Sequence, residues 1–135
     1  MIIGFTGTRA GMTEAQKKVV ARLLEEHKPS EVHHGDCIGA DTHFHELARD
    51  IPRVGHPASG VGDQRAFCQN LSRTYESKPP LERNHDIVNA SDFLIATPKE
   101  SREVLRSGTW ATIRYALKAN KLVHIILPDG TLIIE

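Results

Sequence analysis

Three short turns of this chain combine glycine with side chains that bind phosphate or ribose. They contain Gly7, Thr8 and Arg9; Gly35, Asp36 and Asp41; and Arg106, Ser107, Gly108 and Thr109. Each turn follows an apolar segment typical of a β-strand and leads into a helical pattern. In an open parallel sheet, ligands bind outside the carboxyl ends of the strands, where free backbone amides and helix N-termini face an anion. The turns therefore indicate a nucleotide-type site.

In the first turn, each residue type offers a different contact to a phosphorylated ligand. Gly7 lets the backbone approach closely, Thr8 supplies a hydroxyl, and Arg9 can hold a phosphate through two parallel hydrogen bonds. The glycines at 4, 7 and 11 are spaced three and four residues apart, unlike the dinucleotide fingerprint, and no Gly-Lys-Ser/Thr phosphate loop occurs. The alternative is a purely structural role, because short turns from strand to helix need glycine in any case.

The second turn offers two carboxylates. Asp36 follows the strand end, where an acidic side chain commonly accepts hydrogen bonds from a ribose, and Asp41 opens the next helix. Either carboxylate is a candidate for this contact. The alternative for Asp41 is that it only caps its helix or favours the helix dipole.

The third turn predicts a phosphate cradle at a helix start. Residues 107–109 combine a flexible backbone, two hydroxyls and the positive end of a helix, and Arg106 is adjacent. The alternative is that Ser107 is an ordinary N-cap, which would leave Arg106 in solvent.

The histidines and cysteines do not form a recognisable metal motif. His33 and His34 would point to opposite faces of a strand, and His43 and His45 would lie about 200° apart on a helix. Neither pair converges, so we expect no metal. A nucleophilic pair of Cys37 with a histidine is an alternative for which the sequence offers no orienting acid.

Apolar runs and helical spacings alternate along the chain. We expect strands over residues 1–5, 31–34, 53–56, 92–96, 122–127 and 131–134, and helices over residues 13–27, 39–50, 63–76, 82–90 and 107–120. This alternation predicts an α/β fold, a three-layer doubly wound parallel sheet with strand order 3-2-1-4-5. The last strand would form a C-terminal edge hairpin, and a crevice would open between the loops after the first and fourth strands.

Composition narrows the class of protein. The 135 residues, 39% hydrophobic and 25% charged, fit one domain spanning 1–135. Because 17 basic residues balance 17 acidic ones, no overall positive field attracts nucleic acid, and we do not expect such a partner. Two cysteines are too few for a disulfide framework, and no signal sequence or membrane-length apolar run occurs. We therefore expect a cytoplasmic protein without membrane contact.

In this order, the motifs resemble the SLOG superfamily of Rossmann-like nucleotide-binding domains. The resemblance is carried by residues 4–9, 34–41, 82–84, 92–96 and 107–109, and it covers almost the whole chain. It is strongest to the small single-domain members of the YspA group, with the LOG phosphoribohydrolases and the DNA-processing DprA proteins as more distant relatives. The resemblance implies a nucleotide-like ligand with its phosphate at Gly108 and Thr109, and with Arg83 and Asn84 facing the same crevice. It also implies a homo-oligomer, since related domains usually associate.

The chain departs from the LOG-type hydrolases at their catalytic motif. Those proteins carry Pro-Gly-Gly-x-Gly-Thr-x-x-Glu, whose glutamate assists cleavage of an N-glycosidic bond. Aligned on residues 108–109, Thr112 takes the place of that glutamate, and residues 105–107 contain neither glycine. A threonine cannot supply the carboxylate that stabilises oxocarbenium charge or activates water.

The leading hypothesis is therefore a binding module that senses or sequesters a nucleotide or nucleotide-derived ligand, with no cofactor and no metal. The alternative is a nucleoside 5'-monophosphate N-glycosidase in which Asp36 or Asp41 is the catalytic carboxylate. DNA handling in the manner of DprA is a third possibility, which the balanced charge disfavours.

Overall fold

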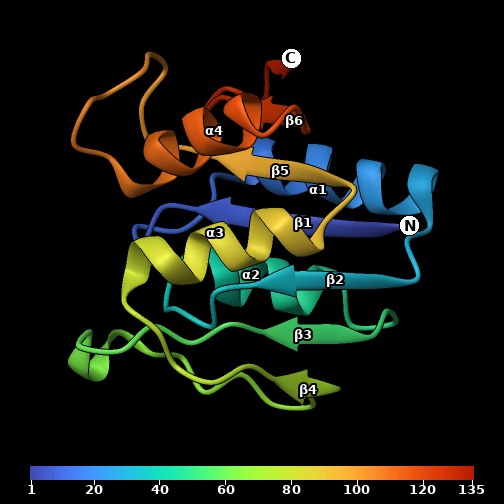
Figure 1. The fold of residues 1–135 in the computed structure, drawn as a ribbon. Coiled ribbons are helices and arrows are strands. Elements are labelled where there is room, and N and C mark those ends of the chain that lie inside the picture. The colour runs from blue at the N-terminus through green and yellow to red at the C-terminus, as the bar shows by residue number, and fades with distance from the viewer.

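The computed structural model describes residues 1–135 and contains one seven-stranded sheet between two layers of helices (Figure 1). The strands are β1 (Ile2–Gly7), β2 (Glu31–His34), β3 (Arg53–Gly55), β4 (Arg73–Thr74), β5 (Phe93–Thr97), β6 (Leu122–Ile126) and β7 (Leu132–Ile134). The helices are α1 (Glu14–His27), α2 (Ala40–Leu47), α3 (Pro80–Ala90) and α4 (Gly108–Lys118), with a 3₁₀ turn over Gly62–Gln64. No helix is long and apolar enough to span a bilayer.

The strand order is β4-β3-β2-β1-β5-β6-β7, and only β7 runs antiparallel to its neighbour. This confirms the predicted three-layer doubly wound α/β fold, including the edge hairpin. The strand β1 pairs with β2 on one side and with β5 on the other, so the direction of winding reverses there. A crevice at the carboxyl ends of β1 and β5 follows from this reversal.

The helices cover the two faces of the sheet in pairs. One buried cluster joins α1 and α2 to the sheet, and within it the rings of Phe5 and Phe44 stack with centroids 4.2 Å apart. The second cluster joins α3 and α4 to the opposite face, around residues such as Leu94 and Ile113. Both α3 and α4 begin at the carboxyl edge of the sheet, so their N-termini face the crevice (Figure 1).

The helix predicted over residues 63–76 is wrong. The chain there forms the 3₁₀ turn, then irregular structure and the short strand β4, which pairs with β3. Phe67 and Asn70 have left-handed backbone angles, with φ of 52° and 62°, which interrupt any helix. Phe67 is also 66% exposed, with the Arg65 guanidinium 4.2 Å from its ring centroid, so the apolar spacing did not mark a buried face.

Candidate functional site: a cavity at the carboxyl edge of the sheet

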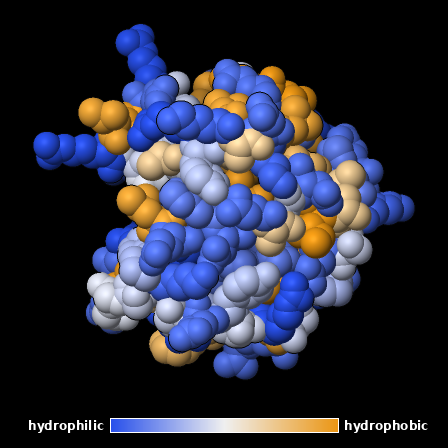
Figure 2. Space-filling view, viewed as in Figure 1, coloured by the Kyte–Doolittle hydropathy of each residue, from blue (hydrophilic) through white to orange (hydrophobic).

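A cavity of about 350 Å³ opens at the carboxyl ends of the central strands. Its volume falls within the range of about 300–1,000 Å³ typical of small-molecule sites. Ten of the twelve predicted ligand-binding residues line it: Gly7, Thr8, Arg9, Gly35, Asp41, Arg83, Asn84, Ser107, Gly108 and Thr109. The strand ends that reach it lie at the left of the molecule in Figure 1, and the surface there is largely hydrophilic with scattered apolar side chains (Figure 2).

The turn after β1 forms the cavity floor and is held from both sides. The Thr8 amide donates to the Thr97 carbonyl at 3.3 Å, and the Thr8 carbonyl accepts from the Ala40 amide at 3.0 Å. Gly7 packs so closely that a Cβ atom there would lie 2.4 Å from the Thr97 hydroxyl and 2.5 Å from Ala40 Cβ. Only glycine fits between Thr97 and Ala40 at this position, so Gly7 is required for the packing of the turn and also lines the cavity.

The start of α4 carries groups that suit an anion. The Ser107 side chain caps the helix by accepting from the Trp110 amide at 3.2 Å. The amides of Gly108 and Thr109 find no acceptor within the protein. Thr109 is only 7% exposed, lines the cavity, and has a hydroxyl without a protein partner. Two free amides and a free hydroxyl therefore face the cavity at the positive end of an eleven-residue helix.

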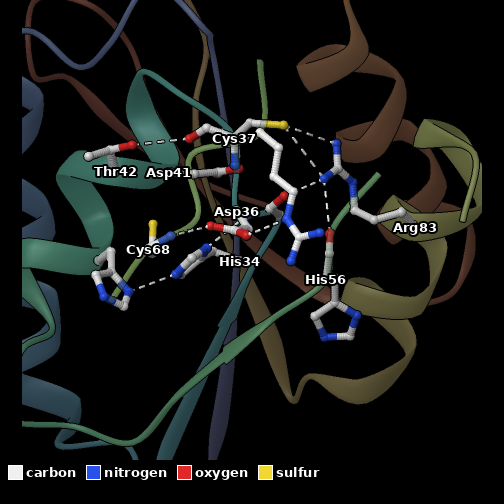
Figure 3. Close-up of polar contacts among 11 residues, drawn as sticks. His34, Asp36, Cys37, Asp41, Thr42, His56, Cys68 and Arg83 are labelled. Carbon is white, nitrogen blue, oxygen red and sulfur yellow. Dashed lines mark hydrogen bonds and ion pairs between the residues drawn. The ribbon is translucent and has the colours of Figure 1, made fainter. Parts of the chain in front are cut away.

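Arg83 is the buried cation of the site. It is 7% exposed, and its Nη1 donates to the carbonyls of Gly35 at 2.6 Å and His56 at 3.0 Å (Figure 3). Its Nε donates to Asn84 Oδ1 at 2.7 Å. These bonds fix the guanidinium at the end of β2, where it supplies positive charge inside the cavity wall. The other two cations of the lining, Arg9 and Lys99, are exposed.

Asp41 is the buried carboxylate of the lining. It is 7% exposed, and its Oδ2 accepts from the Cys37 amide at 3.1 Å. Burial raises the pKa of Asp41 to about 6, although the Arg83 guanidinium acts in the opposite direction. Asp41 is therefore a carboxyl group that titrates close to neutral pH at the cavity surface. Glu100 also lines the cavity, and it accepts from Trp110 Nε1 at 3.2 Å.

Two predicted site residues lie outside the cavity lining. Asp36 is fully buried and pairs with Arg65, whose Nε lies 3.1 Å from Asp36 Oδ2, while the Cys68 amide donates to Oδ1 at 2.8 Å (Figure 3). Both carboxylate oxygens thus anchor the segment 65–68 to the end of β2, which leaves Asp36 no access to a ribose or to water in the cavity. Arg106 is exposed in the loop before α4 and does not line the cavity.

Sequence reasoning missed the apolar part of the cavity wall. Pro80, Leu81 and Ile87 on α3 line it beside Asn84. A signal for them was present, because Pro79-Pro80 marks a helix start and the first turns of that helix must lie at the carboxyl edge of a parallel sheet.

The histidines converge between elements rather than within them. His34 on β2 and His45 on α2, together with Cys68, place three potential metal ligands within 4.8 Å of one another. The Asp36 amide donates to His34 Nδ1 at 3.0 Å, so His34 Nε2 carries the proton and donates to His45 Nδ1 at 3.0 Å. His45 Nε2 in turn donates to the Gln69 carbonyl at 2.5 Å. Every ring nitrogen is therefore used, and the donor set fits a hydrogen-bond chain better than a metal.

The Cys–His pair considered as an alternative does not form at Cys37. Its sulfur contacts Arg83, with Sγ 3.7 Å from Nη1 and 3.8 Å from Nη2, and no histidine nitrogen (Figure 3). Cys37 lines the cavity but has no histidine to remove its proton.

Comparison with known proteins supports the fold. No protein-family model and no curated protein sequence matches the chain. Among solved structures, the molybdenum cofactor binding protein of Rippkaea orientalis superposes with a TM-score of 0.70 at 20% identity, covering 93% of this chain and 76% of that one. The molybdenum cofactor carrier protein of Chlamydomonas reinhardtii gives 0.65 at 20% identity, with coverages of 92% and 75%. DNA processing protein A of Streptococcus pneumoniae gives 0.69 at 16% identity, with coverages of 91% and 49%, so the chain spans about half of that protein. At these identities the similarity shows the fold alone, and that fold is the Rossmann-like α/β architecture expected from the sequence.

Proposed function

We propose that the protein binds a nucleotide or a nucleotide-derived ligand in the cavity at the carboxyl edge of its sheet, and so senses or sequesters it. The observation that carries the proposal is the start of α4, where two free amides and the hydroxyl of Thr109 lack protein partners. A phosphate satisfies such a set of donors at a helix N-terminus. Arg83 supplies buried positive charge in the same cavity, and Arg9 and Lys99 add charge at its surface.

The cavity lining agrees with a ligand that has a phosphate at one end and a base at the other. The polar floor and α4 form one side, and the α3 residues Pro80, Leu81 and Ile87 form an apolar side. We also propose that the protein is related to the YspA group. We propose a cytoplasmic location as well, because the two cysteines are free thiols.

The experiment is native mass spectrometry of protein purified from cells, followed by calorimetric titration with a panel of nucleotides and with inorganic phosphate. We expect a co-purified phosphorylated ligand, or saturable binding of at least one nucleotide that is tighter than binding of phosphate. Thr109→Val should weaken this binding, and Thr112→Val on the same helix is its matched control. Absence of binding by every nucleotide of the panel would contradict the proposal.

A second candidate function is hydrolysis of a nucleoside 5'-monophosphate at its N-glycosidic bond. The observation that favours it is Asp41, a buried carboxyl at the cavity surface whose pKa is raised to about 6, which suits a general acid or base near neutral pH. Incubation with nucleoside monophosphates and chromatography for free base tests it. Base release that Asp41→Asn abolishes is the expected result for an enzyme, whereas unchanged nucleotide after long incubation leaves binding as the function.

The names of the structural neighbours suggest two further ligands for the panel. Molybdenum cofactor is the ligand named for the Rippkaea orientalis protein, and single-stranded DNA is named for DNA processing protein A of Helicobacter pylori, which superposes with a TM-score of 0.68 at 18% identity. We propose a small molecule rather than DNA, because the formal net charge is +0. Titration with single-stranded DNA at low salt checks this choice.

A further inference from the structure

One face of α3 forms an apolar wall of the cavity with a single amide in its centre. Pro80, Asn84 and Ile87 are spaced four and three residues apart, so they fall on one side of the helix, and all three line the cavity. Leu81, one residue further round the helix, lines it too and is 57% exposed. If the phosphate lies at α4, as the proposed function requires, this wall is where the ring of the ligand lies. Among the four residues of this wall, only Asn84 has a side chain that can hydrogen-bond with that ring. Arg83, which also lies on α3, uses its Nε and Nη1 on protein acceptors.

The amide of Asn84 is held in one orientation. Arg83 Nε lies 2.7 Å from Asn84 Oδ1, and a guanidinium can only donate, so the oxygen of the amide must face Arg83. Arg83 cannot move away, because it is 7% exposed and its Nη1 is bonded to the carbonyls of Gly35 and His56. The Asn84 Nδ2 group has no acceptor within the protein. An asparagine that could otherwise turn either end to a ligand is thus fixed as a hydrogen-bond donor.

We propose that Asn84 determines the specificity of this site by donating to a carbonyl oxygen on the ligand ring, and that the protein therefore prefers oxo-purines and oxo-pyrimidines to their amino counterparts. An amino group at the same ring position would bring donor against donor. Asn84 could relieve that clash only by turning its oxygen away from Arg83, which would leave a buried charged donor without its acceptor. The inference rests on the proposed function, since it concerns the ring of the proposed ligand.

The test uses two pairs of nucleotides that differ at this group and, with it, in whether the adjacent ring nitrogen carries a proton. Inosine and adenosine 5'-monophosphate exchange a carbonyl for an amine on a purine, and uridine and cytidine 5'-monophosphate do so on a pyrimidine. Calorimetry on the wild-type protein should give the oxo member of at least one pair the lower Kd by about tenfold, the effect of one hydrogen bond lost against an unsatisfied donor. Ribose 5-phosphate, which has no base, measures the contribution of the sugar and the phosphate.

Variants at Asn84 should change the ratio of the two affinities rather than binding as a whole. Asn84→Ala should bring the ratio close to one, and Asn84→Asp, which presents an acceptor oxygen to the cavity, should shift it toward the amino member. The control is Asn89→Asp, which adds the same charge on α3 at an exposed residue outside the lining, where it should leave the ratio unchanged. Ratios are compared within each variant, and thermal unfolding confirms that each variant folds.

Three results would overturn the inference. Equal affinities within both pairs in the wild-type protein would show that the ring is not read, although binding of ribose 5-phosphate and nucleotides would leave the proposed function intact. A preference that survives in Asn84→Ala would assign the selectivity to another residue. If neither ribose 5-phosphate nor any nucleotide binds, both the proposed function and this inference fail.

Discussion

Replacement of Thr109 by valine separates ligand binding from folding. The Thr109 side chain is 7% exposed at the second residue of α4, and its hydroxyl has no partner in the protein. Valine has nearly the same shape, so Thr109→Val removes the hydroxyl without opening a cavity. Because no internal hydrogen bond is lost, we expect the free energy of unfolding of the ligand-free protein to change by less than about 1 kcal/mol.

The effect on binding should be much larger than the effect on stability. A hydrogen bond to a charged group contributes about 1.5–3 kcal/mol, which corresponds to a Kd for a bound nucleotide that is roughly 10- to 150-fold higher. The control is Thr112→Val. Thr112 lies three residues further along the same helix, is 2% exposed, and donates its hydroxyl to the Gly108 carbonyl at 2.8 Å rather than to the cavity. This control makes the same chemical change in a hydroxyl that the helix already uses.

The assay combines calorimetric titration of the best-binding nucleotide with thermal unfolding in its absence and presence. Ligand stabilises the folded state by an amount set by its concentration relative to Kd, so Thr109→Val should also lose most of the ligand-induced rise in Tm. Equal Kd values for the wild-type protein and Thr109→Val would refute the reasoning, because they would show that the ligand does not use the start of α4. A loss of affinity in Thr112→Val as large as in Thr109→Val would refute it as well.

Three further predictions follow from burial and charge. Burial raises the pKa of Asp41 from 3.8 to about 6, so the folded state binds this proton more tightly than the unfolded chain, and the stability that the proton contributes is lost as pH rises from 3.8 through 6. Between pH 4 and pH 8, the free energy of unfolding of Asp41→Asn, measured with denaturant, should therefore rise relative to that of the wild-type protein by up to about 3 kcal/mol. Burial lowers the pKa of His34 and of His56 from 6.5 to about 3, so below pH 6.5 the unfolded chain binds protons that the folded state does not bind. The free energy of unfolding of the wild-type protein should therefore fall as pH drops below 6.5, and a flat profile down to pH 4 would contradict this. Ile134 on the edge strand β7 is 56% exposed, and we expect this strand to pair with a second copy of the chain. Light scattering should show a dimer or larger species for the wild-type protein and a mass of 15.0 kDa for Ile134→Lys, whereas a wild-type mass of 15.0 kDa at micromolar concentration would rule out this interface.

The sequence by itself determined the fold class, the order of every strand except β4, and most of the cavity surface. The capping box at Thr13 and Gln16 and the proline after His27 bounded α1 because these signals act within one helical turn. Apolar runs such as β5 showed which strands are buried on both faces. Once the strands alternate with helices, right-handed crossovers leave few topologies, and the turns that follow β1 and β5 must meet. Local chemistry and chain connectivity were therefore sufficient for these features.

The tertiary structure alone decided which predicted side chains face the cavity. Asp36 and Asp41 are both acidic residues near one strand end, yet Asp36 is paired with Arg65, a residue 29 positions away in the segment wrongly predicted as a helix. Sequence spacing carries no information about such a partner. The pairing of His34 with His45 likewise joins a strand to a helix across 11 residues, whereas the spacing argument compared histidines only within one element. The donor orientation of Asn84 depends on a buried guanidinium whose own acceptors come from the ends of β2 and β3. Long-range contacts that satisfy buried charges fixed these roles, because a buried charge must find its partners wherever the fold provides them.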